Sequence, residues 1–194
     1  MIERAEVVRD SVFRYLGNPF PSHGASLWNS VTVLGRVRVS SLFEYRAGHQ
    51  LLNRTAWERC VWGVCPELFD RSTSLDRQAA AAGAAVVGSQ VGLVAGFIEN
   101  ADFVKLRELA FSVDLPGAVA SRIGARSASV TVAGRNLMTL TGYSGADPEA
   151  IGFMRPEETN RDPFAFQVPV GFTVEDYMVQ PAPRVWTLRL DVRF

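Results

Sequence analysis

The sequence predicts an all-β fold in which about five antiparallel strands follow one another up and down. Two observations lead to this prediction. Several segments alternate apolar and polar side chains, which is the period of a strand and not of a helix. The connections between these segments alternate between short and long, which is typical of a barrel that crosses a membrane. The sequence therefore predicts a segment of an antiparallel transmembrane β-barrel.

The last ten residues, 185–194, alternate most regularly. Thr187, Arg189, Asp191 and Arg193 stand between apolar neighbours, so one face of the predicted strand is polar. Ten residues match the roughly 9–11 that a tilted strand needs to cross a bilayer. The other face is apolar and ends on an aromatic residue at the chain terminus: Trp186, Leu188, Leu190, Val192 and Phe194.

Three further segments are predicted as strands, and a fourth is weaker. Val31–Tyr45 places six apolar side chains from Val31 to Tyr45 on one face. Phe103–Leu115 alternates in its second half but not in its first, and Ala128–Leu140 alternates throughout most of its length. The opening segment, Ile2–Val12, is compatible with a strand or a helix.

The connections give the predicted topology. Gly17–Gly24, rich in proline and glycine, and Pro116–Arg126 are short. Arg46–Ala101 and Thr141–Pro183 far exceed hairpin length, and we expect them to be two long extracellular loops.

A soluble β-sandwich is the alternative fold. In a sandwich the apolar faces of Val31–Tyr45 and Val185–Phe194 would meet each other. In a barrel they would point away from the protein and leave four arginines inside: Arg36, Arg38, Arg189 and Arg193.

The segment Ala79–Ile98 competes with an all-strand reading, because its twenty residues include only Ser89 and Gln90 as polar residues. That length suffices for a membrane-spanning helix. Alanine and glycine dominate it, however, so the sequence favours a short helix that begins near Leu75 within a long loop.

Composition excludes some classes and leaves others open. The formal net charge is zero, with 20 basic and 20 acidic residues, so no basic surface indicates nucleic acid. Met1 is not followed by a secretory signal, which taken alone favours the cytoplasm; the alternative is that Met1 falls inside a longer polypeptide. Cys60 and Cys65 are too few for a zinc site and are compatible with a local disulfide or with two free thiols.

No group of residues indicates catalysis. His23 and His49 have no metal ligands at suitable spacing, and we expect both in solvated loops. The carboxylate pairs Glu157-Glu158 and Glu175-Asp176 are expected to be solvated charges. The sequence therefore predicts no enzyme, no cofactor and no metal. Three aromatic residues at expected strand ends would suit the girdles of a membrane barrel: Trp28, Tyr45 and Tyr143.

Four motifs between Asp102 and Phe194 occur in the same order as in the SusC/RagA family of TonB-linked outer-membrane transporters. Phe103-Val-Lys-Leu-Arg107, which leads to Leu115-Pro116, resembles the family's antepenultimate strand. The next predicted strand resembles the family's Gly-Arg-Asn-Leu motif, and the loop after it resembles the family's Tyr-x-Gly-x-Asp-Pro-Glu motif. Pro183-Arg184 resembles the segment that leads into the family's last strand, which ends in Phe. The matching residues of these two middle motifs are Gly134, Arg135, Asn136, Leu137, Tyr143, Gly145, Asp147, Pro148 and Glu149.

The resemblance implies a barrel of about 22 strands filled by a plug, which is much larger than this chain. Residues 1–194 would be the C-terminal portion of the barrel, without the plug and the signal peptide. The implied partners are outer-membrane lipid, the remainder of the barrel and plug, a SusD-like lipoprotein and TonB, which would contact the missing N-terminal part. The implied location is the cell outer membrane, and the implied activity is import of nutrients such as glycans or peptides.

The final strand also resembles the signal that the outer-membrane assembly machinery reads, formed by Trp186, Leu188, Leu190, Val192 and Phe194. Five strands leave two open edges with unpaired backbone groups, so we expect the piece to be inactive alone. Two other functions remain as alternatives. One is a soluble or surface β-sandwich that binds carbohydrate or protein, and the other is a small hydrolase that uses loop carboxylates.

Overall fold

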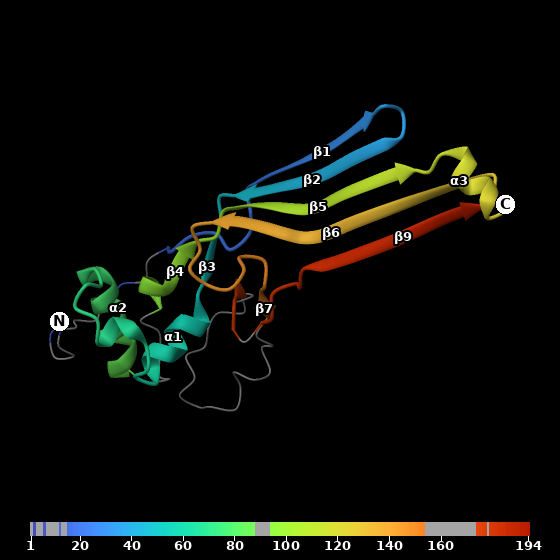
Figure 1. Ribbon diagram of the computed structural model, residues 1–194. Helices are drawn as coiled ribbons and strands as arrows, with labels where there is room; N and C mark the ends of the chain where they lie inside the picture. Colours follow the sequence, from blue (N-terminus) through green and yellow to red (C-terminus); the bar gives the residue numbers. More distant parts are fainter. Residues whose placement is uncertain are drawn as a thin grey trace. The chain divides into compact units, whose positions relative to one another are not determined.

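The computed structural model describes residues 2, 6, 12, 15–87, 94–153, 174–177 and 179–194. The chain forms two compact units (Figure 1). The sheet unit contains 22–47, 103–141 and 182–194, and the connection unit contains 1–21, 48–102 and 142–181.

The sheet unit holds one five-stranded sheet with the order β1-β2-β5-β6-β9. Every neighbouring pair is antiparallel, and each strand pairs with the next strand of this sheet along the chain. The sheet is open, with β1 and β9 at its edges, as Figure 1 shows. The predicted antiparallel, up-and-down, incomplete fold of five strands is thus confirmed. The strands are β1 (His23–Val33), β2 (Val37–Ala47), β5 (Phe103–Asp114), β6 (Ser127–Thr141) and β9 (Val185–Arg193).

The prediction of one strand over Val31–Tyr45 is wrong, because this segment contains a hairpin. Leu34 and Gly35 have φ of 53° and 66°, and the Arg36 amide donates to the Val33 carbonyl at 3.2 Å. Positive φ at both central residues suits the twist of a β-hairpin. Three residues separate the paired Val33 and Val37, so odd-numbered residues stay on one face across the turn. The alternation therefore continues through the turn and conceals it.

The predicted alternation of short and long connections is confirmed, but the first short connection lies elsewhere in the sequence than predicted. The short connections are 34–36 and 115–126, and the second contains helix α3 (Gly117–Arg122). The long ones are 48–102 and 142–184. The turn predicted at Gly17–Gly24 instead leads into β1, which begins at His23, and the segment predicted at Ile2–Val12 lies mostly outside the described residues.

The two long connections together form the connection unit. Its sheet has the order β4-β3-β8-β7, and its helices are α1 (Arg54–Val61) and α2 (Leu75–Val87). The remaining elements are strands β3 (Gln50–Leu52), β4 (Ile98–Asn100), β7 (Gly152–Phe153) and β8 (Val174–Glu175), and 3₁₀ helices η2 (Pro66–Leu68) and η3 (Ala95–Phe97).

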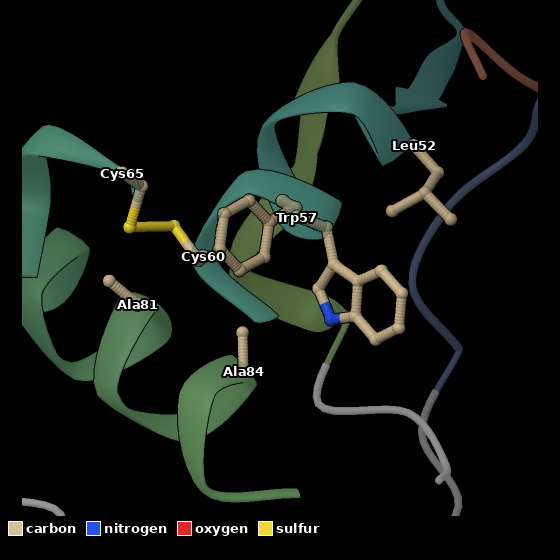
Figure 2. Close-up of a cluster of buried hydrophobic side chains, with 7 residues drawn as sticks. Leu52, Trp57, Cys60, Cys65, Ala81 and Ala84 are labelled. Atoms are coloured by element: carbon tan, nitrogen blue, oxygen red, sulfur yellow. A yellow bond between two sulfur atoms is a disulfide. The ribbon is translucent and has the colours of Figure 1, made fainter. Parts of the chain in front are cut away.

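A small core packs α1 against α2. Trp57 and Cys60 of α1 face Ala81 and Ala84 of α2, with the Cys60–Cys65 disulfide at one side (Figure 2). Helix α1 begins where the Asn53 side chain accepts a hydrogen bond from the Ala56 amide at 2.9 Å, as an N-cap does.

Helix α2 begins at Leu75, where the sequence predicts a short helix, and its described part ends at Val87. Residues 88–93 are outside the described ones. Within the described parts of the chain, no helix combines the length and the apolar character that a membrane crossing requires.

Candidate functional site

The five-stranded sheet presents one apolar face. Residues paired across antiparallel strands have their side chains on the same face, so the register defines this surface. His23, Asn29 and Ser41 are polar residues on this face. The large apolar residues of this apolar face are Leu27, Val31 and Val33 of β1; Val37, Val39, Phe43 and Tyr45 of β2; Val104, Leu106, Leu109, Phe111 and Val113 of β5; Val130, Val132, Met138 and Leu140 of β6; and Trp186, Leu188, Leu190 and Val192 of β9.

Much of the apolar face is open to solvent in the chain by itself. The side chains of Trp186 and Leu188 in β9 are 68% and 74% exposed, and Val31 in β1 is 57% exposed. A soluble sandwich would enclose these side chains between two layers, and this sheet does not. A contiguous exposed apolar surface marks contact with a partner or with lipid.

The opposite face is polar. One row across all five strands joins Thr32, Arg38, Ser112, Thr131 and Arg189. Within this polar face the hydroxyls of Ser112 and Thr131 share a hydrogen bond of 2.9 Å. Trp28 lies on this face, in the middle of β1, so the prediction that it marks a strand end is wrong.

The polar face also carries ion pairs, both between neighbouring strands and within one strand. Arg135 Nε of β6 donates to Glu108 Oε2 of β5 at 2.9 Å, and Arg189 Nη2 donates to Asp191 Oδ1 within β9 at 2.7 Å. The predicted inner arginines Arg38, Arg189 and Arg193 lie on the polar face, whereas Arg36 lies in the β1–β2 turn.

A β-bulge explains why the first half of β5 breaks the alternation. Against β2 the pairing moves from Leu106 to Glu108 and leaves Arg107 as an extra residue. Against β6, Arg107 lies opposite two residues, Asn136 and Leu137. Its Nε donates to Glu44 Oε2 of β2 at 2.6 Å. Because the bulge adds one residue, Val104 and Leu106 stay on the apolar face together with Leu109.

The Gly-Arg-Asn-Leu motif lies opposite this bulge in β6. Asn136 has a φ of 54°, and its Nδ2 donates to the Pro183 carbonyl at 3.1 Å. A Cβ atom on Gly134 would lie 2.9 Å from the Trp186 ring and 2.8 Å from Leu137, so glycine makes room for both side chains. Asparagine tolerates the left-handed conformation better than most residues. Arg184 follows Pro183 and is exposed.

The other predicted motif residues belong to the connection unit. Tyr143 and Pro148 are buried, and a Cβ atom on Gly145 would collide with the Tyr143 ring. Asp147 Oδ1 accepts from the Glu149 amide at 2.8 Å and thereby closes a turn. The structure brings together Tyr143 with Gly145 and Asn136 with Pro183, and it divides the motifs between two units. Tyr143 is not a girdle residue, because it packs with Leu51 and Ala101; burial and the nearby Asp176 raise its pKa.

The prediction that Glu175 and Asp176 are solvated is wrong. Glu175 is 1% exposed and its Oε2 accepts from Arg54 Nη1 at 3.4 Å. Asp176 accepts from the Thr55 amide at 3.1 Å, near the start of α1. Burial raises the pKa of Glu175, and the charge of Arg54 opposes this shift. The partners of these two carboxylates, Arg54 and Thr55, lie 121 positions earlier in the sequence. No local sequence pattern indicates such a distant contact.

His49 is buried as well, so the prediction of a solvated loop is wrong for it; its Nδ1 lies 3.8 Å from Asp102 Oδ1. His23 is exposed at the start of β1. Over the described residues, one group has metal-ligand spacing, formed by Cys60, Cys65 and Glu67, but the two sulfurs are joined in a disulfide. Of the two alternatives for Cys60 and Cys65, a disulfide or two free thiols, the structure has the disulfide.

No protein-family model matches the sequence. A curated protein from Formosa agariphila, TonB-dependent receptor P3, is 31% identical over 98 residues, which are 50% of this chain and 9% of that receptor. The chain resembles a TonB-dependent receptor. The resemblance predicted from the motifs is confirmed by this relative, of whose length the chain spans less than a tenth.

Solved structures give a weaker likeness. The RagAB peptide importer in its closed-closed state is 24% identical, with a TM-score of 0.46 over 59% of this chain and 13% of that one. A second structure, of the RagAB peptide transporter, is 23% identical with a TM-score of 0.43 over 58% and 13%.

Proposed function

We propose that this chain is the C-terminal portion of the barrel wall of an outer-membrane TonB-dependent transporter that imports nutrients such as glycans or peptides. The observation that carries the proposal is the two-faced sheet, because one face is apolar and exposed across five strands while the other is polar. A barrel in a membrane needs this division, with lipid outside and water inside. The likeness to a TonB-dependent receptor supports the same function.

The proposed partners follow from what the sheet lacks. Strands β1 and β9 each pair on one side only within the described sheet, so the rest of the barrel would supply their other neighbours. A plug would fill the lumen, TonB would act through an N-terminal part, and a SusD-like lipoprotein would cover the long connections. None of these proposed roles requires catalysis.

The chain alone should be inactive. Two open edges expose unpaired backbone groups, each of which costs several kcal/mol in hydrocarbon. We therefore expect the separate chain to aggregate or to stay at the membrane surface. A monodisperse species of the separate chain that shifts on a gel when heated would contradict this expectation.

Spin labels on neighbouring residues of β9 test which face meets lipid. Leu188→Cys places a label on the apolar face and Thr187→Cys places one on the polar face, while Cys60 and Cys65 are held in the disulfide. On chain bound to lipid vesicles, we expect oxygen to relax the label at 188 and a water-soluble nickel chelate to relax the label at 187. If protein shields the label at 188 from both reagents, a β-sandwich binding module replaces the transporter.

The C-terminal strand is also proposed as the address for outer-membrane assembly. Deleting Phe194 from the complete receptor should lower the amount inserted into the outer membrane. Replacing the exposed Phe69 of the connection unit with Ala is the matched control and should leave insertion unchanged. Normal insertion without Phe194 would contradict the assembly role.

A further inference from the structure

One end of the five-stranded sheet carries four exposed arginines. Arg36 lies in the β1–β2 turn, Arg122 in α3, Arg126 before β6 and Arg193 at the end of β9. The Asp114 amide donates to the Arg36 carbonyl at 2.9 Å, and the Arg126 amide donates to the Arg193 carbonyl at 2.7 Å. Figure 1 shows the turn, α3 and the C-terminus at this same end of the sheet. We call it the short-turn end.

The short-turn end has few acidic residues to balance these arginines. Asp191 is bound to Arg189, so Asp114 and the terminal carboxylate of Phe194 are the other anionic groups among the described residues there. Within the described part of the chain, no ion pair joins any of the four arginines to a carboxylate. The short-turn end is therefore a surface of net positive charge.

Exposed apolar side chains lie next to these arginines. Leu34 is 91% exposed two residues before Arg36, and Phe194 is 78% exposed directly after Arg193. Val119 of α3 and Ile123, which follows the helix as its C-cap, are also exposed. Apolar side chains mixed with cationic ones suit the layer where lipid headgroups meet acyl chains.

We propose that the short-turn end binds the anionic headgroups of a phospholipid bilayer. The guanidinium groups would contact phosphate oxygens, whose geometry they match, while Leu34, Ile123 and Phe194 enter the edge of the acyl layer. This inference rests on the proposed function, because the short-turn end continues the apolar face at Val113 and Val192. That continuity favours lipid over an acidic protein as the partner.

Vesicle flotation of the full chain tests the proposal. The vesicles contain phosphatidylcholine alone or phosphatidylcholine with phosphatidylglycerol. The double variant R122Q/R126Q removes two arginines of the short-turn end. The matched control R59Q/R71Q removes two exposed arginines of the connection unit. Circular dichroism checks that each variant keeps the β content of the parent chain.

We expect the parent chain to partition more strongly into the anionic vesicles. R122Q/R126Q should lower that partition roughly thirtyfold, at about fivefold per arginine, and leave partition into phosphatidylcholine unchanged. R59Q/R71Q should change neither. High salt should reduce the difference, because it screens surface charge. Inorganic phosphate at matched ionic strength should not displace the chain.

The outcomes separate this proposal from the transporter function. Equal partition into both kinds of vesicle, an equal loss in both double variants, or displacement by inorganic phosphate would overturn headgroup binding and leave the lipid-facing sheet intact. Failure of non-aggregated chain to bind either kind of vesicle would overturn both.

Discussion

The two units of this chain differ in the burial of their large apolar side chains. In the sheet unit, large residues such as Trp186 and Leu188 are exposed, and the strands are held together by backbone hydrogen bonds. In the connection unit, Leu51, Trp57 and Phe97 are buried in small cores. The difference teaches that the sheet depends on surroundings outside the chain for its burial, whereas the connections carry a core of their own.

The largest expected effect comes from placing a charge on the apolar face. In the complete receptor, Leu188→Arg should destabilise the inserted barrel by about 2–4 kcal/mol, because a cation near the bilayer midplane is costly. Thr187→Arg on the polar face is the matched control and should have little effect. Urea unfolding of both receptor variants in lipid vesicles measures the two changes. If the two variants behave alike, the faces do not differ in what they contact, and the contrast with the connection unit is lost.

The second effect belongs to the connection unit. The disulfide between Cys60 and Cys65, five positions apart, closes a short loop beside Trp57 (Figure 2). Replacing both cysteines with Ser should lower the free energy of unfolding of this unit by about 2 kcal/mol, since a short closed loop restricts the unfolded chain. Urea unfolding followed by hydrogen exchange in α1 measures this loss.

A reductant provides the control for the disulfide. It should reproduce the loss in the parent chain and have no effect on the double variant. Exchange in β5 and β6 should stay unchanged, because their ladder contains neither cysteine. A parent chain whose α1 exchanges at the same rate with and without reductant would show that this core does not depend on the covalent bond.

The same contrast explains how much could be predicted from the sequence. β5, β6 and β9 were predictable because alternation is local, and it survives wherever one face is apolar. The hairpin at Leu34 was not predictable from the alternation, because an odd number of turn residues preserves it. Bulges such as the one at Arg107 depend on register against neighbouring strands, which a single segment does not specify.

The connection unit was less predictable because its contacts are long-range. The start of α2 at Leu75 follows from local composition. The burial of Glu175 depends on Arg54, and that of Tyr143 depends on Leu51, each from the other long connection. The motif residues could be found by resemblance, but their division between two units could not, since a motif carries no information on where the chain turns away from a sheet.

The smallest expected effect on stability comes from the protonation of Glu175, and it concerns the connection unit alone. The folded-state pKa of this carboxyl is raised, first by burial, with Asp176 and Glu58 adding to the shift and Arg54 opposing it. A raised pKa means that the folded unit binds the proton more tightly than the unfolded chain does. The stabilising contribution is therefore fully present below the unfolded pKa and is lost as the pH rises through the folded one.

Glu175→Gln should remove this dependence, because the amide keeps an oxygen for Arg54 and carries no charge to desolvate. Hydrogen exchange in α1 between pH 4 and pH 8 measures it: protection should fall with pH in the parent chain and stay level in the variant, after correction for intrinsic exchange. The matched control is Glu108→Gln in the sheet unit, whose carboxylate pairs with exposed Arg135. If Glu175→Gln lowers protection at pH 8, the charged pair with Arg54 stabilises the unit more than burial of the carboxylate destabilises it, and the connection unit is then held by its ion pairs as well as by its apolar core.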